Sequence, residues 1–186
     1  MKRFLVAAAA CAPVAAGPAW AALAVGGKAP EISAKAFENG TASQFQLSEA
    51  LKKGPVVLFF FPGAFTAGCN VEAKAFADNI DKFKAAGATV IGATSYFGNT
   101  ARTSAAQGGL EEAVRDFSKE HCNGKFPVAA VTPDTVKAYD VVLQNTISNR
   151  TSFVIAQNGT ITLTHTDMQP TSHIEKTLAA VQAMKK

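Results

Sequence analysis

The apolar positions of the chain follow two different spacings, and each spacing predicts a different kind of element. Residues 55–61 form a continuous apolar run, Pro-Val-Val-Leu-Phe-Phe-Phe. Such a run is typical of a central strand that is covered on both faces. A helix-like spacing follows and ends at Gly87, a residue type that commonly stops helices. Its apolar members are Val71, Phe76, Ile80 and Phe83.

The same patterns extend over residues 22–186 and predict a single domain, because no linker, repeat or shift in composition divides them. The dipeptides Asn39-Gly40 and Asn158-Gly159 favour hairpin turns. Residues 96–109, rich in Gly, Asn, Ser and Thr, are expected to form a surface loop. The order of elements implies an α/β fold with a mixed sheet and helices on both sides. Further strands are expected at 33–37, 43–47, 89–95, 126–131, 151–156 and 160–165, and further helices at 110–121, 133–139 and 171–184.

Residues 1–21 are expected to be a removable export signal. Lys2-Arg3 form a basic start, residues 4–12 are a short apolar run, and Ala19-Trp20-Ala21 offers small residues to a signal peptidase. The apolar run is shorter than the roughly 20 residues of a membrane-spanning helix, so no membrane insertion is expected after cleavage. The open alternatives are an uncleaved anchor, a buried N-terminal helix, or a lipoprotein attached through Cys11. Export would place the thiols in an oxidising compartment such as the bacterial periplasm.

Composition and charge remove several classes of function. The chain is 48% hydrophobic and 17% charged, so it can bury a core and is not intrinsically disordered. The net charge is only +4 and no run of Lys or Arg forms a basic patch, so nucleic acid is not an expected partner. Three cysteines are too few for a disulfide scaffold. The three histidines, His121, His165 and His173, lack the spacing of metal ligands and are interpreted as ordinary surface or structural residues.

The candidate chemistry lies between the central strand and the long helix. Cys69 falls in the opening turn of that helix, where free backbone N–H groups and the helix dipole favour a thiolate over a thiol. Thr66 can place a hydroxyl beside the sulfur, and Pro62 ends the strand and can shield the pocket from water. The alternative is that Cys69 is merely a small buried hydrophobic residue.

These positions together resemble a known signature. Pro62, Thr66 and Cys69 are similar to the Pro-x-x-x-Thr-x-x-Cys motif of the peroxiredoxins, which are thiol peroxidases on a thioredoxin-like fold. Glu72 stands three residues after the cysteine, as in many members of that family. Arg150 opens the predicted strand in which the family carries its active-site arginine.

The resemblance is strongest to the bacterioferritin-comigratory or Q-type subgroup. Phe126-Pro127-Val128-Ala129 is similar to the segment that precedes a short helix in that subgroup, and the likeness extends from about Gly26 to the C-terminus. It implies a thioredoxin-like, three-layer α/β fold with a mixed central sheet and an N-terminal β-hairpin extension. It also implies a monomer.

The resemblance further implies a mechanism. Cys69 would attack hydrogen peroxide or an organic hydroperoxide as a thiolate and become a sulfenic acid. Arg150, Thr66 and the backbone N–H groups near Gly68 would stabilise the developing negative charge, and Arg150 would favour the thiolate. Glu72 is placed to orient Arg150 through an ion pair; the alternative is a solvated glutamate on the helix surface. No bound cofactor or metal is needed, because the sulfur itself carries the electrons.

The role of Cys122 is open. In Q-type members a resolving cysteine often stands five residues after the first cysteine or in the following helices. The first arrangement is excluded because position 74 is Lys74. Cys122 directly follows the predicted helix 110–121, so the resemblance implies a Cys69–Cys122 disulfide that a thioredoxin-like partner reduces. The alternatives are an inert buried thiol and a one-cysteine mechanism that uses an external thiol.

Two rival functions use the same fold. An exported thiol–disulfide oxidoreductase needs two cysteines separated by two residues, but Thr66 takes the first of those places and residues 70–72 hold no second thiol. A redox-inert, exported thioredoxin-like domain that binds a partner would need no reactive Cys69. The peroxidase is the interpretation that uses all the residues of the motif.

Overall fold

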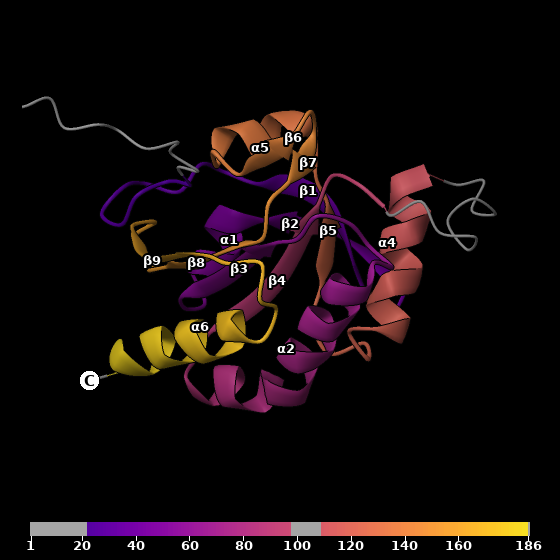
Figure 1. The fold of residues 1–186 in the computed structure, drawn as a ribbon. Coiled ribbons are helices and arrows are strands. Elements are labelled where there is room, and N and C mark those ends of the chain that lie inside the picture. The colour runs from indigo at the N-terminus through magenta and orange to yellow at the C-terminus, as the bar shows by residue number, and fades with distance from the viewer. Residues whose placement is uncertain (1–21, 98–108, 186) are drawn as a thin grey trace, which may run out of the picture.

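The computed structural model describes residues 22–97 and 109–185, in which helices cover both faces of a central sheet (Figure 1). The predicted export signal, and all of the predicted loop except residues 96, 97 and 109, lie outside the described residues. Seven strands pair in the order β2-β1-β5-β4-β3-β8-β9. They are β1 (Ser33–Glu38), β2 (Thr41–Gln46), β3 (Val56–Phe60), β4 (Thr89–Thr94), β5 (Val128–Ala130), β8 (Thr151–Ile155) and β9 (Ile161–Thr166).

The sheet is mixed, as the sequence predicts. Strand β4 runs parallel to β3 and to β5, whereas the pairs β1–β2, β1–β5, β3–β8 and β8–β9 are antiparallel. The N-terminal hairpin turns at Asn39 and Gly40, whose φ angles of 49° and 75° suit the tight turn expected of this dipeptide. The hairpin joins the sheet through β1 and β5, so the expected N-terminal β-hairpin extension is confirmed.

The helices divide between the two faces of the sheet. Their bounds are α1 (Leu47–Leu51), α2 (Ala67–Ala85), α4 (Gly109–Glu120), α5 (Pro133–Ala138) and α6 (Ser172–Ala183). One apolar cluster joins α2, α4 and α6 to the sheet, and a second joins α1 and α5 to its opposite face. None of these helices has the length and apolar character needed to cross a membrane.

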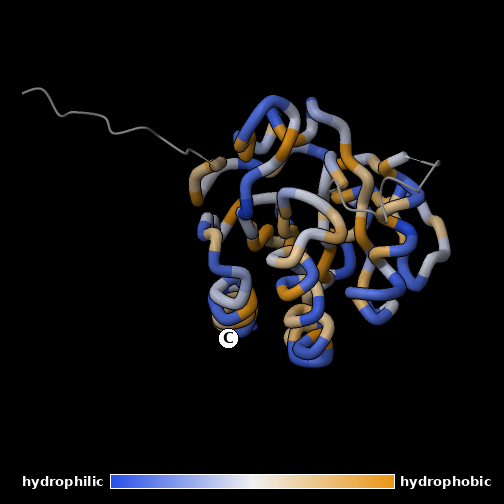
Figure 2. Tube along the Cα trace, turned by 45° about the vertical axis from the view of Figure 1, so that its right-hand side comes forward, coloured by the Kyte–Doolittle hydropathy of each residue, from blue (hydrophilic) through white to orange (hydrophobic). Residues whose placement is uncertain are grey.

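Strand β3 contributes side chains to both clusters, because successive side chains of a strand point to opposite faces of the sheet. All five of its residues are buried. Phe59 faces the α2 side and stacks on Phe76 with ring centroids 4.3 Å apart, whereas Phe60 lies 5.1 Å from the ring of Tyr139 on the other side. The central strands are mostly apolar in Figure 2, while α2 and α6 alternate between apolar and polar positions. The uninterrupted apolar run therefore marks the centre of the fold.

Three features differ from the sequence prediction. Val71, expected on the buried side of α2, is 51% exposed, because a helix turns about 100° per residue and the buried side is set by Cys69, Ala73 and Phe76. Helix α1 was not predicted, since five residues are too few to show a helical period. The short ribbon of β6 (Val142–Gln144) and β7 (Ile147–Ser148) was not predicted either.

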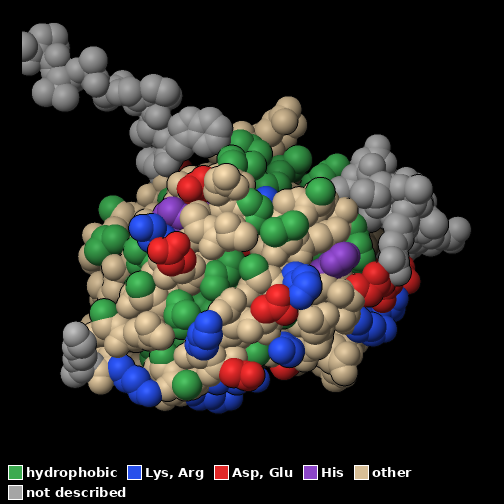
Figure 3. All heavy atoms as spheres, turned by 60° about the horizontal axis from the view of Figure 1, so that its bottom comes forward, with side chains coloured by type: hydrophobic (Ala, Val, Ile, Leu, Met, Phe, Trp, Pro, Cys, Tyr) green, Lys and Arg blue, Asp and Glu red, His purple; other side chains and the backbone are tan. Residues whose placement is uncertain are grey.

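The exposed face of α2 and α6 carries charges of both signs. Figure 3 shows Lys and Arg interspersed with Asp and Glu on this face, with apolar side chains between them. On α2 itself, Lys74 pairs with Asp78 at 2.7 Å, with both side chains more than half exposed. This face therefore presents no large surface of a single charge.

The packing of α2 on β3 gives a stability prediction. Phe76→Ala removes a fully buried ring that stacks on Phe59, so it should destabilise the protein by about 3–5 kcal/mol. Val71→Ala, on the exposed side of the same helix, should change the free energy of unfolding by less than about 0.5 kcal/mol. Urea denaturation followed by circular dichroism measures both. Equal effects of the two substitutions would contradict the observed orientation of α2.

Candidate active site

Cys69 lies in the first turn of α2, directly beyond the buried strand β3. The chain leaves β3 after Phe60 and turns at Phe65, whose φ of 65° is uncommon for a residue with a side chain. Helix α2 then begins at Ala67, with Thr66 as its N-cap. The first N–H groups of a helix have no acceptor in the preceding turn, so the backbone around Cys69 presents donors and partial positive charge.

The sulfur of Cys69 is buried and faces an arginine. The side chain is 1% exposed and the thiol is free. Arg150, which immediately precedes β8, is 3% exposed and directs Nη2 at the sulfur, with 3.6 Å between Nη2 and Sγ. The guanidinium places a fixed positive charge beside the buried sulfur. The structure thus brings together two residues that are 81 positions apart in the sequence.

Glu72 forms an ion pair with the other terminal nitrogen of the same guanidinium. Arg150 Nη1 donates a hydrogen bond to Glu72 Oε2, and the Glu72 side chain is fully buried. The predicted pairing is therefore present, and the alternative of a solvated surface glutamate is wrong. Burial raises the pKa of Glu72 to about 8, against the lowering effect of the nearby Arg150 charge and hydrogen bond.

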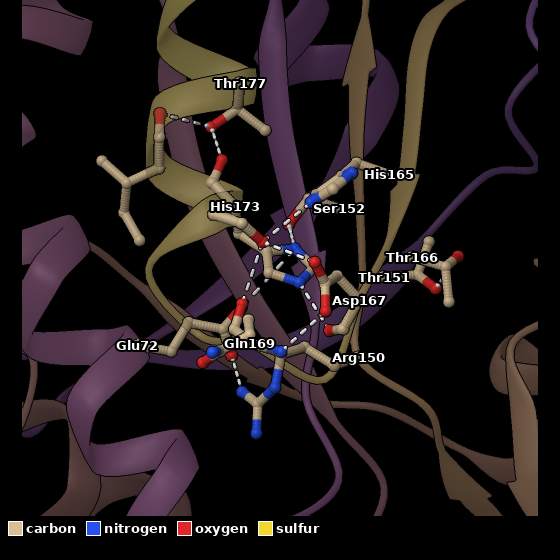
Figure 4. A network of polar contacts seen from close by, with 12 residues as sticks. Glu72, Arg150, Thr151, Ser152, His165, Thr166, Asp167, Gln169, His173 and Thr177 are labelled. Atoms are coloured by element: carbon tan, nitrogen blue, oxygen red, sulfur yellow. Dashed lines mark hydrogen bonds and ion pairs between the residues drawn. The ribbon is translucent and has the colours of Figure 1, made fainter.

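A layer of polar residues lies behind the ion pair, where sequence analysis found none. His173 of α6 is fully buried between Ser152 of β8 and the backbone carbonyl of Asp167 (Figure 4). Each of these two contacts to the imidazole measures 2.8 Å. Burial lowers the pKa of His173 to about 4. The alternation of side chains along an extended strand places Ser152 on the same side as Arg150, and this period of two is the signal that could have identified Ser152.

Thr66 and Pro62 lie in the segment that leads from β3 into α2. Both are half-buried. The Thr66 hydroxyl donates to the backbone carbonyl of Gly63 at 3.0 Å, which fixes the turn before α2. Its predicted interaction with the sulfur stays a prediction, as does shielding of the pocket by Pro62.

Cys122 has a different environment from Cys69. It lies in the turn after α4, where its N–H donates to the carbonyl of Phe117, and it is a free, fully buried thiol. Its neighbours are members of the apolar cluster on the α2 face of the sheet. Burial raises the pKa of the Cys122 thiol well above its ordinary range.

The three histidines differ more from one another than the sequence indicates. His121 packs against the rings of Phe65 and Phe117 beside the end of α4. His165 lies next to His173, with ring centroids 4.7 Å apart, and its Nε2 contacts the Ser172 hydroxyl at 2.9 Å. Within residues 22–97 and 109–185, no three His, Cys, Asp or Glu side chains gather in a way that could hold a metal ion.

Comparison with known proteins places this site in a family. The model of the AhpC/TSA family matches residues 25–164. Peroxiredoxin Q, chloroplastic, of Sedum lineare is 30% identical over 169 residues, which cover 83% of this chain and 82% of the relative. The corresponding protein of Gentiana triflora is 28% identical over 167 residues, with 82% and 70% covered.

The fold is also found among solved structures. The crystal structure of Peroxidoxin BcpB from Mycobacterium tuberculosis superposes with a TM-score of 0.72 at 23% identity, covering 87% of this chain and 98% of that chain. This likeness shows the thioredoxin-like fold that the sequence predicts. The family model spans most of the chain and includes Cys69, Glu72 and Arg150. The chain therefore belongs to the AhpC/TSA family of peroxiredoxins, enzymes that reduce peroxides with electrons from thiols such as those of thioredoxin.

Proposed function

We propose that this peroxiredoxin reduces hydrogen peroxide and organic hydroperoxides through Cys69 and serves in antioxidant defence. The observation that carries the proposal is the contact between Arg150 Nη2 and the buried Cys69 sulfur, 3.6 Å apart at the start of α2. Within this site, a cation, a helix N-terminus and a thiol converge. A redox-inert binding domain leaves this convergence without a use, and a thiol–disulfide oxidoreductase would need a second cysteine near Cys69, where Thr66 and residues 70–72 provide none.

The proposed reaction moves two electrons from sulfur to the peroxide. The Cys69 thiolate attacks one peroxide oxygen, the S–O bond forms as the O–O bond breaks, and the other oxygen takes a proton and leaves as water or alcohol. Cys69 becomes a sulfenic acid. Negative charge spreads from sulfur onto both oxygens in the transition state, so donors fixed beside the sulfur accelerate the reaction. Arg150 Nη2 and the N–H groups of the first turn of α2 are such donors.

The first test replaces the proposed nucleophile. Cys69→Ser should abolish turnover of hydrogen peroxide and of an organic hydroperoxide, because the hydroxyl of serine is not ionised at neutral pH and cannot accept the oxygen. Competition with a haem peroxidase for hydrogen peroxide measures the rate of the first step. A wild-type rate no faster than that of free cysteine at the same pH would refute the peroxidase proposal, and activity retained in Cys69→Ser would place the chemistry at another residue.

Gly68 provides a test of the arginine that leaves the nucleophile in place. A Cβ atom at Gly68 would lie 3.0 Å from Arg150 Nη2, so Gly68→Ala should displace the guanidinium by a few tenths of an ångström. We expect the rate with peroxide to fall about ten-fold, since small misplacements of catalytic groups have large effects. Stability should not fall, because Ala favours helix over Gly by about 0.8–1 kcal/mol.

The control for this substitution is Ala67→Gly, which changes the exposed residue next to Gly68 by one methyl group and adds no atom near Arg150. It should keep the rate of the wild type. If Gly68→Ala reacts with peroxide as fast as the wild type, the position of the guanidinium is not important for the reaction.

We further propose that Cys122 resolves the oxidised Cys69. A groove of about 200 Å³ lies between the start of α2, which carries Cys69, and the turn after α4, which carries Cys122. Asn70 and Val71 line the groove from α2, and His121 and Asn123 line it from the turn after α4. Asn123 and Gly124 have φ angles of 50° and 62°, so two left-handed residues follow Cys122 directly. Local opening of this turn would release the thiol from the core toward the groove. A thioredoxin-like partner would then reduce the disulfide by exchange.

The resolving role predicts a defined product. After one equivalent of hydrogen peroxide, mass spectrometry of the wild type should find an intramolecular Cys69–Cys122 disulfide. In Cys122→Ser the sulfenic acid on Cys69 should persist and react with dimedone. A dimedone adduct on Cys69 of the wild type, with the Cys122 thiol still free, would show that Cys122 is inert and that an external thiol completes the cycle.

We also propose that residues 1–21 direct export to an oxidising compartment such as the bacterial periplasm. The support is the basic start, the short apolar run and the small residues at 19 and 21. Cell fractionation and N-terminal sequencing of the mature protein test it. Retention of residues 1–21 in the mature protein would refute cleavage.

The proposed oligomeric state is a monomer, which rests on the resemblance to the Q-type subgroup. Sedimentation velocity of the reduced protein over a range of concentrations tests it. A dimer or larger species at micromolar concentration would refute it.

A further inference from the structure

The tip of the N-terminal hairpin packs against the turn that contains Cys122. Asn39 and Gly40 form this hairpin tip between β1 and β2. Residues 121–125, the Cys122 turn, directly follow α4. A Cβ atom at Gly124 would lie only 2.7 Å from Asn39 Cβ, so the backbone of the turn touches the hairpin tip. Two segments that are far apart in the sequence therefore meet beside the second thiol.

Ser118 joins the hairpin tip and the Cys122 turn through hydrogen bonds. Its side chain is fully buried in the last turn of α4. The hydroxyl accepts the N–H of Gly40 at 3.0 Å and donates to the backbone carbonyl of Arg115 at 2.7 Å. The backbone carbonyl of Ser118 accepts the N–H of Gly124 at 3.0 Å. One residue thus binds the tip with its side chain and the turn with its main chain.

The closed turn keeps the Cys122 thiol inside the core. The side chain is 0% exposed and belongs to the apolar cluster that also contains Phe37 of β1. To reach the groove beside α2, the sulfur must leave this cluster, which requires an outward movement of the turn. Such a movement separates Gly124 from both Asn39 and Ser118. The contacts with the hairpin tip therefore oppose the opening of the turn.

Polar contacts matter more in this turn than apolar packing does. Asn123 and Lys125 are exposed, and His121 and Gly124 are half-buried. Segments with few buried apolar contacts open at a low cost in free energy, so each remaining contact has a large share in the frequency of opening. Lys125 supplies a second attachment, because its Nζ donates to the carbonyl of Ala77 on α2 at 3.2 Å.

We propose that Ser118 and Asn39 are positioning residues for the resolving step: through them the hairpin tip keeps the Cys122 turn closed and sets how often the thiol leaves the core. The proposal rests on the proposed resolving role of Cys122. In that step the Cys122 sulfur forms an S–S bond with Cys69 as the S–O bond of the sulfenic acid breaks. The oxygen leaves as water with the proton of the thiol. Ser118 and Asn39 act through the backbone of the turn.

The opening of the turn is measured by the labelling of Cys122 in the Cys69→Ser protein. A buried thiol reacts with iodoacetamide only while its segment is open, so the labelling rate, followed by mass spectrometry, reports the frequency of opening. Adding Ser118→Ala removes the acceptor of the Gly40 N–H. We expect the labelling rate of Cys122 to rise about ten-fold, the effect of losing one hydrogen bond of this kind. An unchanged rate would overturn the proposal.

Two controls separate this local opening from other effects. Ser33→Ala is the same substitution in the same hairpin, but Ser33 lies at the start of β1, where it accepts from the Gln44 side chain at 3.0 Å. It should leave the labelling rate unchanged. Thr177→Ala removes a buried hydroxyl that donates to backbone carbonyls of α6, so it should lower global stability without raising the rate. If it raises the rate as much as Ser118→Ala for an equal loss of stability in urea, the opening is global unfolding and the proposal is wrong.

A double-mutant cycle tests the contact between the tip and the turn. Gly124→Ala places a methyl group against Asn39 and forces alanine to a φ of 62°, so it should speed the labelling of Cys122. Asn39→Gly removes the side chain that the methyl group meets. Because the strain at position 124 is the same in both backgrounds, Gly124→Ala should speed labelling less in Asn39→Gly than in the protein that keeps Asn39. An equal effect in both backgrounds would refute the role of Asn39.

The consequence for the reaction is measured with Cys69 in place. After one equivalent of hydrogen peroxide, Ser118→Ala should form the Cys69–Cys122 disulfide about ten-fold faster than the wild type, in proportion to the more frequent opening. The rate of the first step with peroxide should not change, because Arg150 and the start of α2 stay as they are. An unchanged rate of disulfide formation, despite faster labelling, would overturn the positioning role. Absence of the disulfide in both proteins would refute the resolving role itself, whereas the labelling rates would still report whether the tip keeps the turn closed.

Discussion

A single buried guanidinium governs the arrangement of the site. Arg150 is 3% exposed and contacts two acidic groups, the thiol of Cys69 and the carboxyl of Glu72. Away from water, an anion without a counter-charge is penalised by several kcal/mol. The charges of the sulfur and the carboxyl are consequently linked through the cation between them.

The sheet brings these groups together from distant parts of the chain. Strands β3 and β8 are antiparallel neighbours, and Phe60 at the end of β3 pairs with Thr151 at the start of β8. The chain continues from Phe60 into the turn that presents Cys69, while Arg150 precedes Thr151 on the neighbouring strand. Helix α6 then packs against α2 and β8 and supplies His173 from behind. The apolar strand at the centre thus fixes the position of the polar site at its end.

The parts of this structure that local chemistry decides could be predicted from the sequence. The ends of the predicted strands and helices lie within two residues of those observed, and Cys69 does lie at a helix start. Contacts between residues that are distant in the sequence were harder to predict. The orientation of Val71 depends on which side of α2 meets the sheet, and the place of His173 depends on how α6 crosses β8. A lone histidine in a helical pattern carries no local signal of a buried carboxyl opposite it, because that neighbour is 101 residues away in the sequence.

The two cysteines are equally buried but have different neighbours. Cys69 and Cys122 are almost equally inaccessible, at 1% and 0% exposure. Around Cys122 the neighbours are apolar, so burial penalises the thiolate and raises the pKa of this thiol. Around Cys69 the fold instead places a guanidinium and the N-terminus of a helix. The fold therefore gives two equally buried thiols opposite surroundings, with a cation and a helix start beside Cys69 and apolar side chains around Cys122.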